Sequence, residues 1–218
     1  MPSPRSAAAL PTWPPPSLHP VADATSERIL DAAREQLTLI GVRRTTMDDV
    51  ARRASVSRIT VYRRFPTKDD LVRAVFLREA QTLFDTVDEA VSHLPRAADQ
   101  LVEGFVAILT AGRRHPLLSG LLEVEPESVL PYFTLGGGPI LALARGYLAG
   151  QVRRGQHSGQ LRDIDPEAVA ELAVRLTVSF ILTPDSCFPL EDEDDLRTFA
   201  RRYLVPAVVA GPAARTTS

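Results

Sequence analysis

Residues 57–65 combine hydroxyl, tyrosine and arginine side chains at spacings that suit contact with duplex DNA. Arg58 and Thr60 lie near the start of this segment, where a helix inserted into the major groove presents its side chains to base edges. Arginine pairs with guanine in that groove, and hydroxyl or methyl groups contact other bases. We therefore predict that Arg58 and Thr60 contact base edges and that Ile59 is available to a thymine methyl group.

A second set of side chains around this segment suits phosphates. Arginine, lysine, tyrosine, hydroxyls and the N–H groups at helix starts donate to phosphate oxygens and fix the register of a protein on DNA. The residues predicted to contact phosphates are Arg43, Arg44, Thr46, Ser57, Tyr62, Arg63, Arg64 and Lys68. The alternative is a solvated helical face whose arginines only aid solubility. The joint occurrence of turn, cap, basic face and terminating Pro66 favours DNA.

Three helices are predicted to position these side chains. The first begins at a cap on Thr25 or Ser26 and ends at Gly41, a residue that commonly stops helices. The second is capped by Thr45 or Thr46 and runs through Arg53, and the third spans 57–65 after a tight turn. Apolar residues repeat at helical spacing, so one face of each helix is expected to lie in a core.

The charges divide unevenly along the chain. Residues 43–73 hold nine Lys/Arg against four Asp/Glu, whereas residues 81–218 hold twelve against eighteen. The formal net charge of −2 therefore conceals a basic module on an acidic body. That asymmetry is expected when only one end of a protein contacts DNA.

The composition argues against several other classes of protein. One cysteine, Cys187, excludes an intrachain disulfide framework and fits a reducing cytosol. No run approaches the roughly 20 apolar residues that span a bilayer, and we see no secretory signal. The four histidines lack metal-ligand spacing. We predict a cytoplasmic protein with no metal, no cofactor and no membrane partner.

Beyond residue 66 the chain shows further helical patterns and no convincing strand pattern. The expected helices span 67–92, 96–114, 117–133, 139–156, 166–182 and 194–209. The fold class is therefore predicted to be all-α, with about nine helices. Proline-rich residues 1–20 are interpreted as a disordered arm, and residues 211–218 as a disordered tail.

At the residues around the turn, the chain resembles the TetR family of bacterial transcriptional repressors. The family pattern is Thr-x-x-x-[Ile/Val]-Ala, a Gly-Val-Ser turn, Leu-Tyr-x-x-Phe and then Lys-x-x-Leu. This sequence has Thr46-Met-Asp-Asp-Val50-Ala51, Val56-Ser57, Val61-Tyr62-Arg-Arg-Phe65 and Lys68-Asp-Asp-Leu71. Ser55 replaces the turn glycine and must adopt a left-handed backbone or reshape the turn. Ile59 replaces a small residue, which is expected to alter base preference.

The resemblance implies a helix-turn-helix DNA-binding domain, at 21–66, on a larger helical effector-binding and dimerisation domain, at 67–210. It implies a homodimer on a palindromic operator, with half-sites roughly 34 Å apart or farther apart if two dimers bind. It also implies release by a small-molecule effector, which we expect to be hydrophobic or amphipathic. Two alternatives stay open. One is a module with this fold that has lost DNA recognition, and the other is an all-α enzyme, for which we find no catalytic constellation.

The resemblance also assigns roles in the body. The helices at 166–182 and 194–209 look like the family's dimer interface, and the residues expected there are Val174, Val178, Ile181, Leu196, Phe199 and Tyr203. The residues expected to line an effector cavity are Phe105, Leu109, Tyr132, Phe133, Leu141, Tyr147 and Phe180. For both sets the alternative is plain monomer core.

Overall fold

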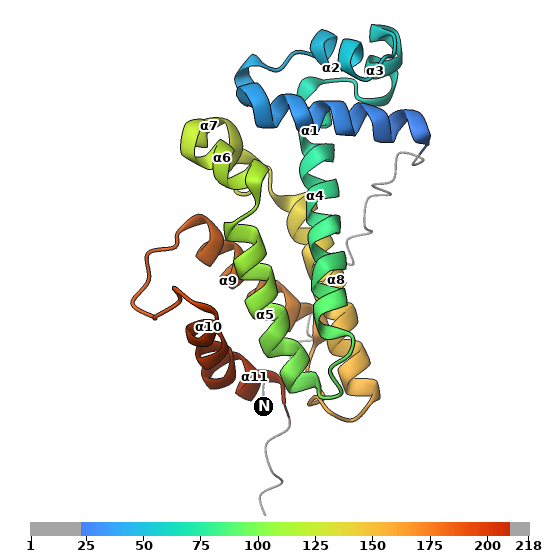
Figure 1. Cartoon of the computed structure of the whole chain (residues 1–218). Helices are drawn as coiled ribbons and strands as arrows, with labels where there is room; N and C mark the ends of the chain where they lie inside the picture. Colours follow the sequence, from blue (N-terminus) through green and yellow to red (C-terminus); the bar gives the residue numbers. More distant parts are fainter. Residues whose placement is uncertain (1–22, 210–218) are drawn as a thin grey trace, which may run out of the picture.

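The computed structural model describes residues 23–209, which form a small helical head on a longer helical body (Figure 1). Within this range the one strand-like feature is an isolated bridge between Leu161 and Val209, so the predicted all-α class is confirmed. The predicted arm at 1–20 and tail at 211–218 lie outside the described residues. No helix in 23–209 is long and apolar enough to cross a membrane.

Three helices form the head: α1 (Ala24–Arg44), α2 (Met47–Arg53) and α3 (Arg58–Arg64). Hydroxyl caps begin the second and third. The Thr46 hydroxyl accepts the N–H of Asp49, and the Ser57 hydroxyl accepts that of Thr60. These bonds satisfy backbone donors that have no partner within the helix. Both helices therefore begin and end within a residue of their predicted bounds.

The two ends of α1 were not equally predictable. Its N-cap is Asp23, whose carboxylate accepts the Ser26 N–H at 2.7 Å, so the cap predicted at Thr25 or Ser26 is wrong. A carboxylate suits this position because it also meets the positive end of the helix dipole. At the other end Gly41 has φ +82, which breaks the regular helix at the predicted residue.

The turn between α2 and α3 contains Ser55, whose φ of 54 makes it the one non-glycine residue with positive φ in 23–209. The turn closes as the Val56 N–H donates to the Ala51 carbonyl at 3.0 Å. A left-handed backbone costs a non-glycine residue about 1–2 kcal/mol. Ser55 therefore preserves the turn by adopting the conformation that glycine would take.

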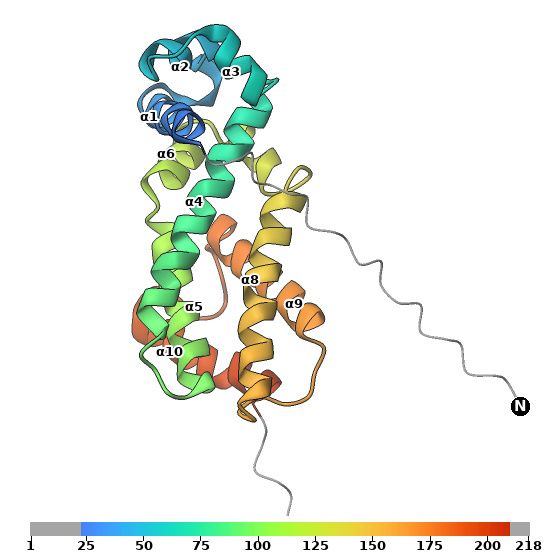
Figure 2. The same ribbon diagram turned by 90° about the vertical axis from the view of Figure 1, so that its right-hand side faces the viewer.

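The body is built on four long helices: α4 (Lys68–Val91), α5 (Ala97–Arg113), α8 (Gly138–His157) and α9 (Pro166–Leu182). α4 begins in the head and runs down the body, and α8 lies beside α9 (Figure 2). Below the head lie α6 (Pro116–Val124) and α7 (Pro126–Val129). At the far end, α10 (Glu193–Phe199) and α11 (Val205–Val208) pack on α5.

Two predicted helices are each broken into shorter pieces. The segment 117–133 divides at Glu125 into α6 and α7 and ends in a 3-10 turn at Leu130–Tyr132. The segment 194–209 changes to a π-helical turn at Ala200–Leu204 before α11. Pro206 explains that change, because proline lacks the N–H that the preceding helical turn requires. Residues 23–209 consequently form more helical pieces than the about nine helices expected.

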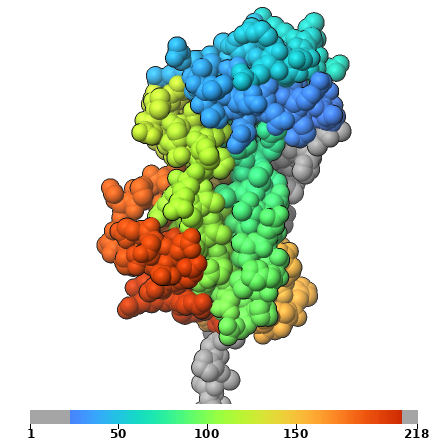
Figure 3. All heavy atoms as spheres, viewed as in Figure 1, coloured from blue at the N-terminus to red at the C-terminus, as the bar shows by residue number. Residues whose placement is uncertain are grey.

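Two apolar clusters hold these elements together. The first joins head residues such as Ile29 and Val61 to Leu117 of α6 and Val129 of α7. The head therefore rests directly on the upper body (Figure 3). The second cluster lies among α5, α9 and α10, around Phe199.

Candidate functional site

α3 places most of the predicted DNA-contacting side chains on the outer side of the head. Its inner residues Val61 and Phe65 are 0% and 3% exposed, whereas Ile59 is 80% exposed and the Arg58 side chain 63%. The other exposed members of the set are Arg43, Arg44, Thr46, Ser57, Tyr62 and Arg63. One short helix thus buries an apolar side and presents a basic, hydroxyl-bearing side to solvent.

Arg58 is held in position by its neighbours on the head. Its Nε lies 3.0 Å from an Asp48 carboxylate oxygen on α2, and its guanidinium carbon stands 5.2 Å from the centre of the Tyr62 ring. Because the ion pair is exposed it is weak. Arg58 can therefore exchange Asp48 for another acceptor at little cost.

The hydroxyls assigned to DNA already have partners within the protein. The Thr46 hydroxyl donates to the Asp49 carboxylate at 2.6 Å, and the Ser57 and Thr60 hydroxyls lie 2.8 Å apart. Each O–H must turn from its present partner to donate to a phosphate or a base.

Arg64 does not belong to the outer surface. Its side chain is 17% exposed, its Nε donates to the Ser26 hydroxyl at 3.0 Å, and its guanidinium pairs with Asp23. The hydrogen bond from the Arg64 guanidinium holds the pKa of Asp23 well below its usual range. The predicted exposure of Arg64 is wrong because it follows Val61 by three residues and shares its inward side of the helix. It ties α3 to the start of α1.

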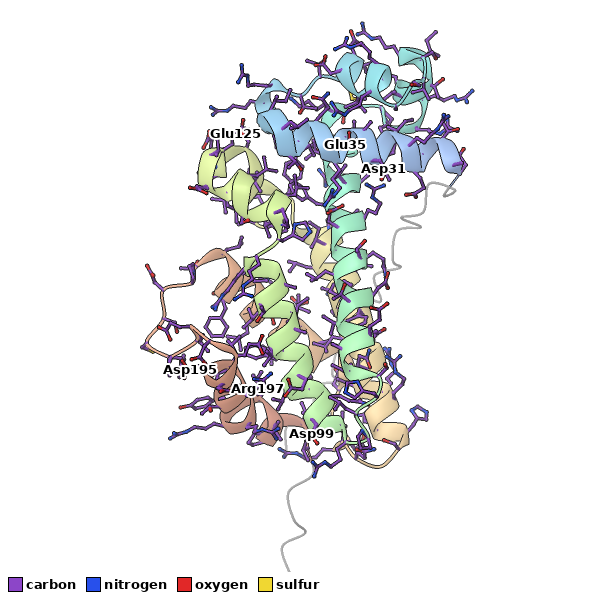
Figure 4. The ribbon with its side chains drawn as sticks, viewed as in Figure 1. Asp31, Glu35, Asp99, Glu125, Asp195 and Arg197 are labelled. Atoms are coloured by element: carbon purple, nitrogen blue, oxygen red, sulfur yellow. The ribbon has the colours of Figure 1, made fainter. Side chains whose placement is uncertain are left out.

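Glu125, which was not among the predicted site residues, lies beneath the end of α1 (Figure 4). It is only 8% exposed and accepts the Arg43 N–H at 3.0 Å. A Cβ atom at Gly41 would come within 2.1 Å of its Oε1, so this contact requires a glycine. In the sequence Glu125 precedes Pro126 and resembles an ordinary helix end. Only the packing of α6 against α1 shows that it contacts the end of α1.

Lys68 and Arg43 lie at the same junction. Lys68 Nζ donates to the Arg43 carbonyl at 3.1 Å, and Arg43 pairs with Glu127 at 2.6 Å. Burial lowers the pKa of Lys68, against the opposing effect of Glu125. Residues predicted to contact phosphates are therefore connected to carboxylates of the body.

An apolar cavity of about 410 Å³ lies in the body between α4, α5, α8 and α9. Phe105, Phe133 and Tyr147 are the predicted liners that reach it. The prediction is wrong for Leu109, Tyr132, Leu141 and Phe180, which do not line the cavity. Leu109 and Phe180 belong instead to the second apolar cluster, and Tyr132 packs on Phe76. The volume lies within the range of small-molecule sites.

The predicted dimer face is largely monomer core. Leu196, Phe199 and Val174 are 2%, 6% and 7% exposed, and the Phe199 ring lies 5.6 Å from that of Phe105 on α5. The interface prediction is contradicted at Leu196 and Phe199 because α10 folds its apolar side onto α5, and at Val174 because this side of α9 faces the cavity. Val178 and Ile181 line the cavity, and Tyr203 is 47% exposed.

Two family models cover most of the chain. The model described as bacterial regulatory proteins, tetR family, matches residues 29–75, and that of the bacterial tetracyclin repressor C-terminal domain matches residues 95–202. The chain belongs to the TetR family. It is a helix-turn-helix transcriptional regulator, and family membership sets aside the enzyme alternative.

Curated relatives of this TetR-family chain are themselves regulators. It is 25% identical over 186 residues to the uncharacterized HTH-type transcriptional regulator YhgD of Bacillus subtilis, with 84% of this chain and 95% of YhgD covered. It is 28% identical over 177 residues to the HTH-type transcriptional regulator AlkX of Mycobacterium tuberculosis, with 80% and 81% covered.

Several solved structures share the fold, among them two repressors of the TetR family. The repressor AlkX from Dietzia, implicated in biodegradation of n-alkanes, aligns with a TM-score of 0.65 at 24% identity, covering 84% of this chain and 94% of its own. The repressor QsdR of R. erythropolis gives 0.64 at 21%, covering 88% and 100%. RolR with resorcinol gives 0.60 at 14%, covering 84% and 87%.

Proposed function

We propose that this TetR-family regulator is a homodimeric repressor that binds a palindromic operator through α3 and releases it when a small apolar effector occupies the body. The observation that carries the proposal is the outer side of α3, where exposed Arg58, Ile59 and Arg63 stand on the buried residue Val61. The head also holds the excess of positive charge in the chain. We infer a palindromic operator because a dimer with two-fold symmetry places its two recognition helices on half-sites related by the same symmetry.

The individual contacts form part of this proposal. We assign Arg58, Ile59 and Thr60 to base edges, since they lie in the first turn of α3, which enters the groove. The remaining exposed donors are assigned to phosphates: Arg43, Arg44, Thr46, Ser57, Tyr62, Arg63 and the partly buried Lys68. Arg64 is left out because it is paired within the head.

For the dimer we propose an interface around the outer side of α9. Leu172 on this helix is 72% exposed and also lines the cavity, so the apolar interior reaches the surface there. A second copy of the chain would cover this opening. Because α3 lies in the head and the proposed interface in the body, we assign DNA binding to a domain at 21–66 and dimerisation and effector binding to a domain at 67–210.

The effector role is inferred from the cavity. Its wall is mostly leucine, valine, isoleucine, alanine and phenylalanine, which favours an apolar or amphipathic molecule. The names of two fold relatives agree, since one is a repressor implicated in n-alkane biodegradation and another is a complex with resorcinol. The junction of Arg43 and Lys68 with Glu125 offers a route from the body to the head.

Selection of bound fragments from random duplex DNA tests the DNA-binding part. We expect enrichment of one palindrome by the wild-type chain, and no enrichment by a variant with Arg58 and Arg63 both changed to alanine. A matched control changes Arg96 and Arg114, exposed arginines of the body away from α9, in the same way. Absence of enrichment by the folded wild type would favour the module that has lost DNA recognition.

Oligomeric state tests the interface. Leu172→Glu is expected to give monomers in sizing experiments with light scattering. Leu39→Glu, which places the same charge on an exposed leucine of α1, is expected to leave the dimer intact. A wild-type chain that is monomeric at micromolar concentration, or a dimeric Leu172→Glu, would refute this interface.

A further inference from the structure

Two ionisable side chains, Glu79 and His115, interrupt the apolar wall of the cavity at the end near the head. Glu79 comes from α4, and His115 is the cap residue of α6. Their side chains are 13% and 20% exposed. Burying a charged carboxylate in an apolar wall costs free energy unless the carboxylate is paired. The partners of Glu79 therefore determine which of its oxygen atoms is left to bind a ligand.

The hydrogen bonds assign the proton on His115. Its Nδ1 accepts the Leu118 N–H at 3.4 Å, which leaves Nε2 to carry the proton in the neutral ring. Nε2 lies 3.3 Å from Glu79 Oε2, to which it donates. His115 thus holds the carboxylate from the α6 side.

Arg34 of α1 holds the same oxygen from the head. Its Nε donates to Glu79 Oε2 at 2.9 Å. Burial alone would raise the pKa of Glu79, but the hydrogen bonds from His115 and Arg34 bring it below its ordinary value, so the group stays charged. Both bonds engage Oε2, and among residues 23–209 no hydrogen bond is found to Oε1.

A carboxylate can only accept hydrogen bonds, and this fixes the kind of polar group that suits the free oxygen. A ligand donor such as an ammonium or hydroxyl group would satisfy Oε1. A ligand carboxylate would face a like charge, since Arg34 does not line the cavity and lies behind Glu79. The rest of the wall near this end, including Phe76, Ala80 and Leu83, offers only apolar contacts.

We infer that Glu79 is the polar anchor of the cavity and that the preferred ligand is an elongated apolar molecule ending in a hydrogen-bond donor, above all an alkylammonium. This inference rests on the proposed role of the cavity as an effector site. Because the anchor also holds Arg34 of α1, a ligand bound to it would act directly on the contact between body and head.

Calorimetric titration of the full chain with decylamine, decanol and decanoate, below their micelle concentrations, tests the anchor. Decylamine is charged at neutral pH, as lysine is. Hydrogen bonds to charged groups are strong enough that we expect it to bind about tenfold or more tightly than decanoate, with decanol between them.

Variants then separate the anchor from its surroundings. Glu79→Gln keeps an acceptor oxygen but removes the charge, so the preference for decylamine is expected to fall to about threefold or less. Asp85→Asn makes the same change at an exposed carboxylate of α4 outside the cavity and is expected to keep the preference. Arg34→Gln retains the carboxylate and removes its cation, so the preference is expected to increase even if Glu79→Gln does not fold.

Three results would overturn the anchor: no binding of any probe, decanoate binding as tightly as decylamine, or an unchanged preference in folded Glu79→Gln. Release of a fluorescent operator is measured separately. A chain that prefers decylamine without releasing DNA would keep the anchor and refute the effector role.

Discussion

The head and the body both consist of helices on apolar cores, but only the head fills its core. In the head Ile29, Val50 and Val61 have no exposed surface. In the body the apolar faces of α4, α5, α8 and α9 leave about 410 Å³ between them. A filled core fixes one arrangement of surface side chains, whereas an apolar cavity leaves room for a ligand.

The polar groups of the two regions differ in the same way. The head carries its cations on the outside, where Arg58 and Arg63 are exposed. The body places one charged group, Glu79, in the wall of its cavity, with Arg34 as its partner. The head is thus suited to a highly charged polymer and the body to an apolar molecule with one polar end.

The largest expected difference between the regions is their response to salt. If a dimer neutralises about 6–10 phosphates, operator affinity should fall about 10³–10⁵-fold between 50 and 200 mM salt. Decanol is uncharged, so its binding to the body should change by less than about twofold. Fluorescence anisotropy and calorimetry measure the two affinities. Operator binding that is insensitive to salt would break the comparison.

The second prediction concerns the packed part of the body. Phe199→Ala should lower the free energy of unfolding by about 3–5 kcal/mol, because the ring is buried against Phe105 and Phe180. Leu172→Ala, at an exposed position, should change monomer stability by about 0.5 kcal/mol or less. Urea denaturation at low protein concentration measures both. If Phe199→Ala changed the free energy of unfolding only slightly but abolished the dimer, Phe199 would belong to the dimer interface instead of the monomer core.

The third prediction divides the surface of the head into base and phosphate contacts. Arg58→Ala should cost about 1–3 kcal/mol on the operator and relax discrimination at one base pair. Arg63→Ala should weaken binding to all sequences alike and reduce the salt slope by about 1. Binding assays on single-base operator variants measure both effects. If Arg58→Ala still discriminated fully between the base pairs of the operator variants, Arg58 would not contact a base.

The smallest expected effect is at the turn of the head. Ser55→Gly should stabilise the chain by about 1 kcal/mol, because glycine takes a positive φ without the strain that serine bears. Ser57→Gly, on the same segment, should instead destabilise it by a few tenths of a kcal/mol through loss of the α3 cap. Thermal denaturation measures both. Lower stability of Ser55→Gly would show that serine makes a contact that offsets its strain.

The head was predictable because its signals are local. Caps at Thr46 and Ser57, the break at Gly41 and the inward pair Val61 and Phe65 depend on residues a few positions away. Arg64 was predicted wrongly for a reason that is not local. Whether its side of α3 meets solvent or α1 depends on how the helices pack.

The body was less predictable because an apolar residue at helical spacing gives the same sequence pattern whether it lies in the core, in the cavity wall or on the surface. Phe199, Phe105 and Leu172 all fit a helical period, yet one is core, one lines the cavity and one is exposed. The path of α10 onto α5 decides the first of these, and no short-range pattern encodes that path.

The sequence by itself determined the all-α class, the helix-turn-helix and the basic character of the head, since these follow from short-range spacing and charge. Only the tertiary structure decided which apolar faces meet, and therefore where the cavity lies. It also brought Glu79 to Arg34 and His115, and Glu125 to Gly41 and Arg43. Those contacts join residues dozens of positions apart, so their chemistry exists only once the helices have packed.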